Sequence, residues 1–128
     1  MGKVYRGLRL IQIGCGGKPV NARCKVWVRG DDRREHPLNP RTDLVNHSPT
    51  GYEWGYSGAG PAQLAFALVY DVIGDRRRAE RVYQDIKRLI VCKFHYRGWG
   101  ITEEELLAAI DVIEDRNDRN KADRRRNH

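Results

Sequence analysis

The segment Gly51 to Gly60, GYEWGYSGAG, has the residue types of a ligand site. Tyr52, Trp54 and Tyr56 could stack on a base. Glu53 could accept a hydrogen bond from a ribose hydroxyl or an exocyclic amine. The glycines would let the backbone approach such a ligand closely. The chemistry predicted for this segment is therefore the binding of a nucleotide-like molecule.

The segment also leads into the start of a predicted helix, where anions can bind. Pro61 suits the first helical position, and the backbone N–H groups of residues 62–64 would lack partners within the helix. Together with the helix dipole, these groups could hold a phosphate or carboxylate against residues 57–63. Basic side chains from the sheet or a neighbouring subunit would complete the site, and the nearest are Arg29, Arg33, Arg34 and Arg41. The candidate ligand-binding residues are Tyr52, Glu53, Tyr56, Ser57, Gly58, Gly60, Gln63, Arg29, Arg41 and His47.

A second interpretation of the same segment is purely structural. The alternation of Tyr52, Trp54 and Tyr56 with Glu53 and Gly55 also fits an extended segment whose rings fill the gap between sheet and helix. The glycines would then serve close packing. Both interpretations stay open for the segment as a whole, and packing is favoured for Trp54.

The sequence contains none of the common catalytic motifs considered for it. GCGGKP fails as a phosphate-binding loop, because Gln12 and Pro19 stand where a glycine and a Ser or Thr are required, so it predicts a hairpin turn. The two serines and four histidines form neither a nucleophile elbow nor an HExxH motif. His47 lies near Glu53 in sequence, but a histidine that hydrogen-bonds the loop backbone explains it better than acid–base catalysis. We expect no catalytic residues.

Metal and cofactor binding are not expected either. Cys15, Cys24 and His36 lack a recognised ligand spacing. The three cysteines form no CxxC motif, and their odd number argues against a disulfide framework. Free thiols are therefore predicted.

The basic residues favour an alternative function. The chain has 128 residues and a net charge of +7, which favours anionic partners. Arg77, Arg81 and Arg88 share one helix face, and Arg124, Arg125 and Arg126 cluster at the C-terminus, so both groups could contact the phosphates of a nucleic acid. Asp85 and other nearby acids instead suggest a solvated, salt-bridged face.

The elements that position these residues begin with a small antiparallel sheet. KVYRGLRLIQIG alternates Val4, Arg6, Leu8 and Leu10 with Tyr5, Arg9 and Ile11, and ARCKVWVRGDD places Cys24, Val26 and Val28 opposite Lys25, Trp27 and Arg29. A third short strand is predicted at Glu35 to Leu38, where Pro37 restricts it to an edge. The loop from Asn39 to Thr50 then crosses to the helices.

Three helices should follow. The first runs from Pro61 to Gly74 and is apolar on nearly all sides, so we expect it to be buried, in part by a second subunit. The second is predicted from Arg76 to Phe94, and the third opens at Thr102 with the capping pattern TEEE. Residues 1–115 therefore form one α+β domain, and residues 116–128 a basic, frayed or flexible tail. No apolar run is long enough for a membrane span, so a cytoplasmic protein is expected.

The stretch NHSPTGYEWGYSGAGPAQLAFALVYDVIGD, followed by YQDIKRLIV, a tryptophan and a Thr-capped last helix, resembles a family of short bacterial and phage proteins described only as a domain of unknown function. The resemblance covers about residues 4–113 and departs from the family at residues 57–60 and in the tail. It implies a phage or mobile-element setting, in which small basic proteins inhibit host defence by binding a nuclease, a nucleic acid or a nucleotide signal.

These observations lead to one expected function and one alternative. We expect a non-enzymatic phage-type protein, forming a homo-oligomer, that sequesters an anionic nucleotide-like ligand and so inhibits host defence. The alternative is a basic interaction protein that contacts nucleic acid or a nucleic-acid-processing protein, in the manner of an anti-CRISPR inhibitor.

Overall fold

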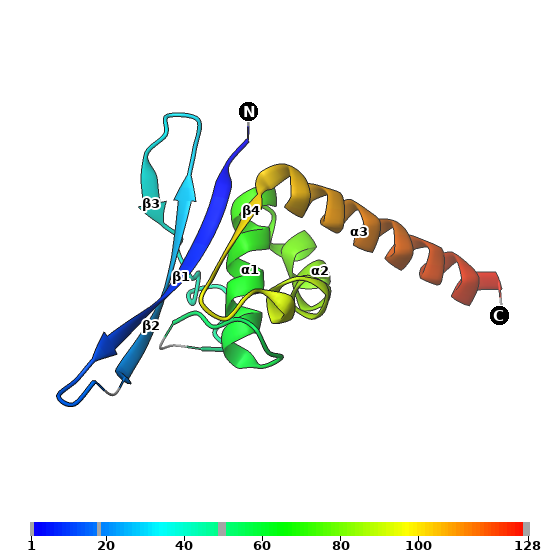
Figure 1. The fold of residues 1–128 in the computed structure, drawn as a ribbon. Helices are drawn as coiled ribbons and strands as arrows, with labels where there is room; N and C mark the ends of the chain where they lie inside the picture. Colours follow the sequence, from blue (N-terminus) through cyan, green and yellow to red (C-terminus); the bar gives the residue numbers. More distant parts are fainter. Residues whose placement is uncertain (1, 18, 49–50, 127–128) are drawn as a thin grey trace.

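Four antiparallel strands form one sheet, and three helices lie together on one of its faces (Figure 1). The computed structural model describes residues 2–17, 19–48 and 51–126. The strand order is β3-β2-β1-β4. The predicted α+β class, with a small antiparallel sheet and three helices, is confirmed.

The long hairpin of β1 (Val4–Ile13) and β2 (Pro19–Arg29) is the centre of the sheet. Its register pairs Val4 with Arg29 and Arg9 with Cys24. The turn has positive φ angles at Gly16 (85°) and Gly17 (76°), a conformation that glycine adopts without steric cost. The described part of GCGGKP before β2, Gly14 to Gly17, is thus the predicted hairpin turn, and Lys18 lies outside the described residues.

The two outer strands are short. β3 (Glu35–Pro37) pairs with the end of β2, where a third strand was predicted. β4 (Gly98–Thr102) pairs with β1 and was missed, because its two glycines and short length give no clear alternation. β4 brings the chain back to the sheet between the second and third helices.

Helix α1 (Ala59–Ile73) starts two residues before the predicted Pro61 and ends at Gly74, which has a φ of 66°. Its residues from Gly60 to Val69 are buried, as predicted. This burial is complete within a single chain, against the sheet, the other helices and the loops. The apolar circumference of α1 therefore gives no reason to expect a second subunit.

Helix α2 (Arg76–Leu89) begins at Asp75, whose side chain accepts a hydrogen bond from the Arg78 N–H (3.2 Å). It ends five residues before the predicted Phe94, in the short 3₁₀ turn η1 (Val91–Lys93). The turn is where the chain leaves the helix layer and returns toward β4.

Helix α3 (Glu103–Arg126) begins with the predicted capping box. The Glu105 N–H donates to Thr102 Oγ1 (3.1 Å), and the Thr102 N–H donates to Glu105 Oε1 (3.3 Å). Leu106, Ile110 and Ile113 are buried in the core. Beyond Asp115, where the basic tail was placed, the backbone continues as the same helix to Arg126 and projects from the body (Figure 1). Among the described residues, none of the helices combines the length and apolarity that a membrane span requires.

The alternation of the strands separates two faces of the sheet. Tyr5, Val26 and Ile101 are buried against the helices. Leu8 and Leu10 lie on the opposite face and are 38% and 44% exposed. One polar residue of β1, Arg9, shares the inner face with Tyr5, and its side chain is only 4% exposed.

Candidate functional site

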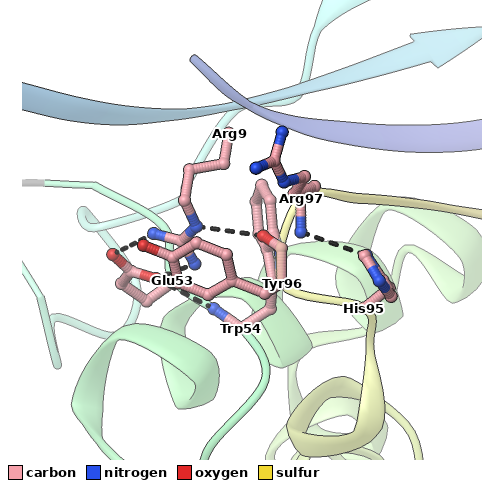
Figure 2. Close-up of polar contacts among 6 residues, drawn as sticks. All are labelled: Arg9, Glu53, Trp54, His95, Tyr96 and Arg97. Carbon is pink, nitrogen blue, oxygen red and sulfur yellow. Dashed lines mark hydrogen bonds and ion pairs between the residues drawn. The ribbon is translucent and has the colours of Figure 1, made fainter. Parts of the chain in front are cut away.

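Glu53 is held by a bidentate ion pair with Arg9. Arg9 Nη1 donates to Glu53 Oε2 (2.9 Å), and Nη2 donates to Oε1 (2.6 Å), so β1 and the predicted ligand segment are joined directly (Figure 2). This hydrogen bonding to Arg9 holds the pKa of the Glu53 carboxyl below its usual value. Glu53 is therefore an anion whose charge is already balanced.

Arg9 itself is enclosed by aromatic groups. Its guanidinium lies over the Tyr96 ring (4.0 Å to the centroid) and near the Trp54 ring (5.2 Å), and its Nε donates to the Tyr96 carbonyl (3.0 Å). Planar arginine suits such a setting, because it can stack on rings and form a forked ion pair at once. Sequence reasoning missed Arg9, although its place on the same strand face as Tyr5 was the available signal.

Trp54 belongs to the core, as predicted. Its side chain is 1% exposed, its Nε1 donates to the Tyr96 carbonyl (3.0 Å), and its ring meets Trp99 edge-on. Trp99 in turn stacks on Phe94 at 4.1 Å and lies flat against Gly7, where a Cβ would come within 2.5 Å of its ring. Trp54 therefore joins this cluster of rings to the Arg9 guanidinium.

The glycines of the segment serve close packing. A Cβ at Gly60 would lie 2.5 Å from Glu53 Cβ, so glycine lets residue 53 pass directly over the start of α1. A Cβ at Gly58 would meet the Tyr56 ring at 2.8 Å. At both positions the structure supports the packing interpretation.

The helix start differs from the predicted anion site. Because α1 begins at Ala59, Ala62 donates its N–H to the Gly58 carbonyl (3.0 Å), and residues 63 and 64 lie inside the helix. The prediction of open N–H groups at residues 62–64 is therefore wrong for Ala62. The first N–H groups of the helix are instead those of Ala59 and Gly60. Ser57 is exposed beside this start.

Gln63 organises the loop between sheet and helices. Its Oε1 accepts from the N–H groups of His47 (2.8 Å) and Ser48 (3.2 Å), and its Nε2 donates to the carbonyls of Pro40 (2.6 Å) and Val45 (2.8 Å). All four hydrogen-bonding positions of the carboxamide are occupied, and the residue is fully buried. Gln63 is a structural residue here.

His47 points to α2 rather than to the predicted segment. Its Nε2 lies 2.6 Å from the Tyr83 hydroxyl, and the two rings are 5.6 Å apart. The backbone of His47 is held by Gln63. The structure does not bring His47 and Glu53 together as an acid–base pair.

The predicted arginines lie elsewhere. Arg41 has a φ of 57°, pairs with Asp43 (3.1 Å) and lies over the Tyr70 ring (4.9 Å). Arg29 is at the far end of β2, five residues beyond Cys24. Arg33 and Arg34 follow Arg29 in the β2–β3 turn, so none of these side chains completes the site around Glu53.

A cavity of about 380 Å³ does combine two predicted residues with basic side chains of the sheet. Tyr52 and Glu53 line it, together with two basic residues of β2 that sequence reasoning missed. These are Arg23 and Lys25, which lie where β3 does not pair with β2. The described lining is Arg23, Cys24, Lys25, Ser48, Gly51, Tyr52 and Glu53. The strand pattern could not have found Arg23 and Lys25, because their alternation with Cys24 assigns their side chains to the opposite face of β2.

Partial burial determines the protonation states of Cys24 and Tyr52, which line the cavity. Burial raises the pKa of the Cys24 thiol to about 11, and it raises the pKa of Tyr52, whose hydroxyl donates to the Leu38 carbonyl (2.6 Å). At neutral pH both are uncharged, so Cys24 is a poor nucleophile. The charges of the cavity are two cations and the Arg9–Glu53 pair.

The alternative basic surface is partly neutralised. Arg88 pairs with Asp85, Arg76 with Glu80 (2.9 Å), and Arg78 with Glu114 of α3 (2.7 Å). Arg77 and Arg81 are exposed on α2, and Arg124 and Arg125 are exposed near the end of α3. The structure describes only the backbone of Arg126.

No group of three His, Cys, Asp or Glu side chains that could hold a metal ion occurs in the described ranges. A family model described as a family of unknown function (DUF6166) matches residues 5–112. The chain belongs to this family. No curated protein and no solved structure matches it.

Proposed function

We propose that this DUF6166 member is a non-enzymatic binding protein that holds an anionic, nucleotide-like ligand in the cavity between β2 and residues 48 and 51–53. One observation carries the proposal: Arg23 and Lys25 line the same cavity as Tyr52 and Glu53. The volume of about 380 Å³ is in the range of small-molecule sites.

The charge of the cavity favours an anion. Arg9 balances Glu53, so Arg23 and Lys25 leave the cavity net positive. Neither residue forms an ion pair within the part of the chain that the structure describes. Phosphate oxygens are suitable partners for both side chains.

The Arg9–Glu53 pair adds a means of recognition. Arg9 fixes the carboxylate in one orientation. Oε1 also accepts from the Trp54 N–H (3.3 Å), while Oε2 keeps an acceptor position beyond its bond to Arg9. Glu53 is 35% exposed and can accept from a ribose hydroxyl or an exocyclic amine, as expected from its residue type. Its role in the proposal is to select the ligand, while Arg23 and Lys25 supply the attraction.

The biological role within this proposal is sequestration. A protein that binds its ligand without converting it lowers the free concentration of that ligand. A nucleotide signal of host defence would be inactivated in this way. The phage or mobile-element setting rests on the family resemblance described above. The residues around the cavity would therefore bind the nucleotide, and we expect no catalytic turnover of it.

The test is ligand-induced stabilisation by a panel of linear and cyclic nucleotides. A nucleotide that binds only the folded protein stabilises it by about 2.7 kcal/mol at a concentration of 100 Kd, which raises the melting temperature. Arg23→Gln should remove most of this shift. Arg77→Gln, which removes the same charge from an exposed site on α2, should leave it unchanged.

Two results would contradict the proposal. One is a melting temperature that does not change with any nucleotide at millimolar concentration. The other is a shift that Arg23→Gln leaves intact.

The alternative function, contact with nucleic acid or a nucleic-acid-processing protein, has one supporting observation. The distal part of α3 projects from the body with Arg124 and Arg125 exposed (Figure 1). If α3 provides the contact, a chain that ends at Asp115 should no longer be retained on DNA or RNA. Retention of the intact protein should decrease steeply with salt concentration. Retention that survives the truncation would exclude α3 as the contact.

A further inference from the structure

The face of the sheet that is turned away from the helices is not covered by any described part of the chain (Figure 1). The strand registers place Val4, Arg6, Leu8 and Leu10 of β1 on this face beside Arg29, Trp27, Lys25 and Arg23 of β2. We refer to these eight residues as the outer face. Its central side chains are basic, aromatic and aliphatic, which is unusual for a sheet surface that only meets water.

Arg6 and Trp27 form a fixed flat platform on the outer face. The Arg6 guanidinium lies 4.7 Å from the centroid of the Trp27 ring. Arg6 Nε and Nη2 also donate to the two carboxylate oxygens of Glu35 (2.7 and 2.9 Å), which holds the guanidinium in place. Planar guanidinium and indole groups are surfaces on which nucleic-acid bases stack.

The outer face carries an excess of positive charge. Glu35 of β3 is the acidic residue that the registers of the described strands place there, and Arg6 neutralises it. Arg23, Lys25 and Arg29 remain, and no ion pair within the described ranges involves them. At the Arg29 end, the face continues into a hollow of about 600 Å³ lined by Arg29, Arg33 and Asp31. Asp31 already has an interaction partner.

The dimensions suit an extended chain. Arg23 and Arg29 are six residues apart on one strand, which corresponds to about 20 Å. The Arg6–Trp27 platform and Leu8 lie between them, and Leu8 packs over Gly98 of β4. A bound chain would therefore meet cations at both ends and stacking or apolar surfaces in the middle.

We propose that the outer face binds single-stranded nucleic acid. Arg23, Lys25 and Arg29 contact phosphates, and bases stack on the Arg6–Trp27 platform. An unpaired strand is the occupant because its bases are free to stack, whereas a duplex offers only its phosphates to a flat face. The inference goes beyond the small-ligand cavity, which it adjoins at Arg23 and Lys25.

The test measures fluorescence anisotropy of a labelled oligothymidylate about 12 nucleotides long with the intact protein. Trp27→Leu should weaken binding by about tenfold, as loss of a stacking side chain does. Arg29→Gln should weaken binding and reduce the slope of log K against log salt by about 0.7, the value for one phosphate contact of a single strand. Arg29 is exposed, so its variant also serves if Trp27→Leu fails to fold.

Lys93→Gln is the matched control, because it removes one positive charge from an exposed position in η1, which belongs neither to the outer face nor to the arginines of the alternative function. Its binding should equal that of the wild type, and unlabelled duplex should compete less well than unlabelled single strand. The proposal is overturned by absence of binding at low salt or by equal losses in Arg29→Gln and Lys93→Gln. It is also overturned if duplex or polyglutamate competes as well as the single strand. Trp27 and Arg29 do not line the cavity, so their variants should leave nucleotide-induced stabilisation unchanged, and the two proposals can fail separately.

Discussion

At the scale of single residues, the Arg9–Glu53 pair links packing to binding. Arg9 is nearly buried, and Glu53 is its only carboxylate partner in the described ranges. An arginine in this position requires a counter-charge, because burial of an unpaired cation is costly. The pair thus stabilises the fold and at the same time orients the carboxylate that lines the cavity.

Glu53→Gln should destabilise the protein by about 1–3 kcal/mol. Loss of one partner of a fully buried pair costs about 3–5 kcal/mol, and the partial exposure of Glu53 reduces this value. Urea denaturation measures the change. Glu80→Gln removes the partner of an exposed pair on α2 and should cost no more than about 0.5 kcal/mol, so equal effects of the two variants would contradict the role given to Arg9.

The pH dependence of stability provides a second check on the same pair. In the folded protein the pKa of Glu53 lies below 4.5, its value in the absence of structure. A lowered folded-state pKa contributes stability that is present above 4.5 and lost as the pH falls through the folded pKa. The stability difference between wild type and Glu53→Gln should therefore narrow below about pH 4.5 in urea denaturation series. A constant difference would show that Glu53 acts through its shape rather than its charge.

Gly60→Ala tests close packing at the start of α1. Alanine has the better helix propensity by about 1 kcal/mol, but its Cβ would lie 2.5 Å from Glu53 Cβ. The steric effect should dominate and destabilise the protein by about 1–3 kcal/mol in thermal or urea unfolding. Gly100→Ala, whose nearest neighbour would be 3.8 Å away, is the control, and a stabilised Gly60→Ala would refute the close contact.

Residue-level prediction from sequence was most reliable where a side chain acts alone. The burial of Trp54 and the capping pair of Thr102 and Glu105 follow from residue type and spacing. Arg9 and Gln63 could not be assigned, because their partners are distant in sequence and depend on the tertiary fold. Residue type alone cannot show that a polar group is already fully hydrogen-bonded.

At the scale of elements, the loop from Asn39 to Ser48 depends on Gln63 of α1. Gln63 bonds two carbonyls and two N–H groups of this loop. Gln63→Leu should leave these backbone groups unpaired, lower the stability by about 2–4 kcal/mol and increase hydrogen exchange at His47 and Ser48. Gln84→Leu on α2 is the control, and unchanged exchange in Gln63→Leu would contradict the role of Gln63.

The elements were predictable where a periodic pattern is long. β1 and β2 carry such patterns, and each was found within a few residues of its observed bounds. α1 was found equally well from its long apolar run between Pro61 and Gly74. β4 was missed because its residues Gly98 to Thr102 pair with β1 only through the tertiary fold. The end of α2 was placed too late because Ile90 and Phe94 continue the apolar spacing into η1.

At the scale of the whole molecule, the body and the distal part of α3 differ in their contacts. The buried residues of α3 end at Ile113, and the described side chains beyond Asn117 are exposed. A chain that ends at Asp115 should therefore keep the melting temperature of the intact protein within about 2 °C. A large decrease would show that the distal helix supports the body.

We propose binding on the sheet side of the molecule, in the cavity and on the outer face, while α1 and the aromatic cluster of Trp54, Trp99 and Phe94 are structural. The small-ligand cavity is the principal binding site that we propose. The most direct measurement is an NMR titration of the ¹⁵N-labelled protein with the stabilising nucleotides. We predict the largest amide shift changes at residues 23–25, 48 and 51–53, with loss of these changes in Arg23→Gln. Saturation without changes at these residues, or changes confined to α2 and α3, would contradict the claim.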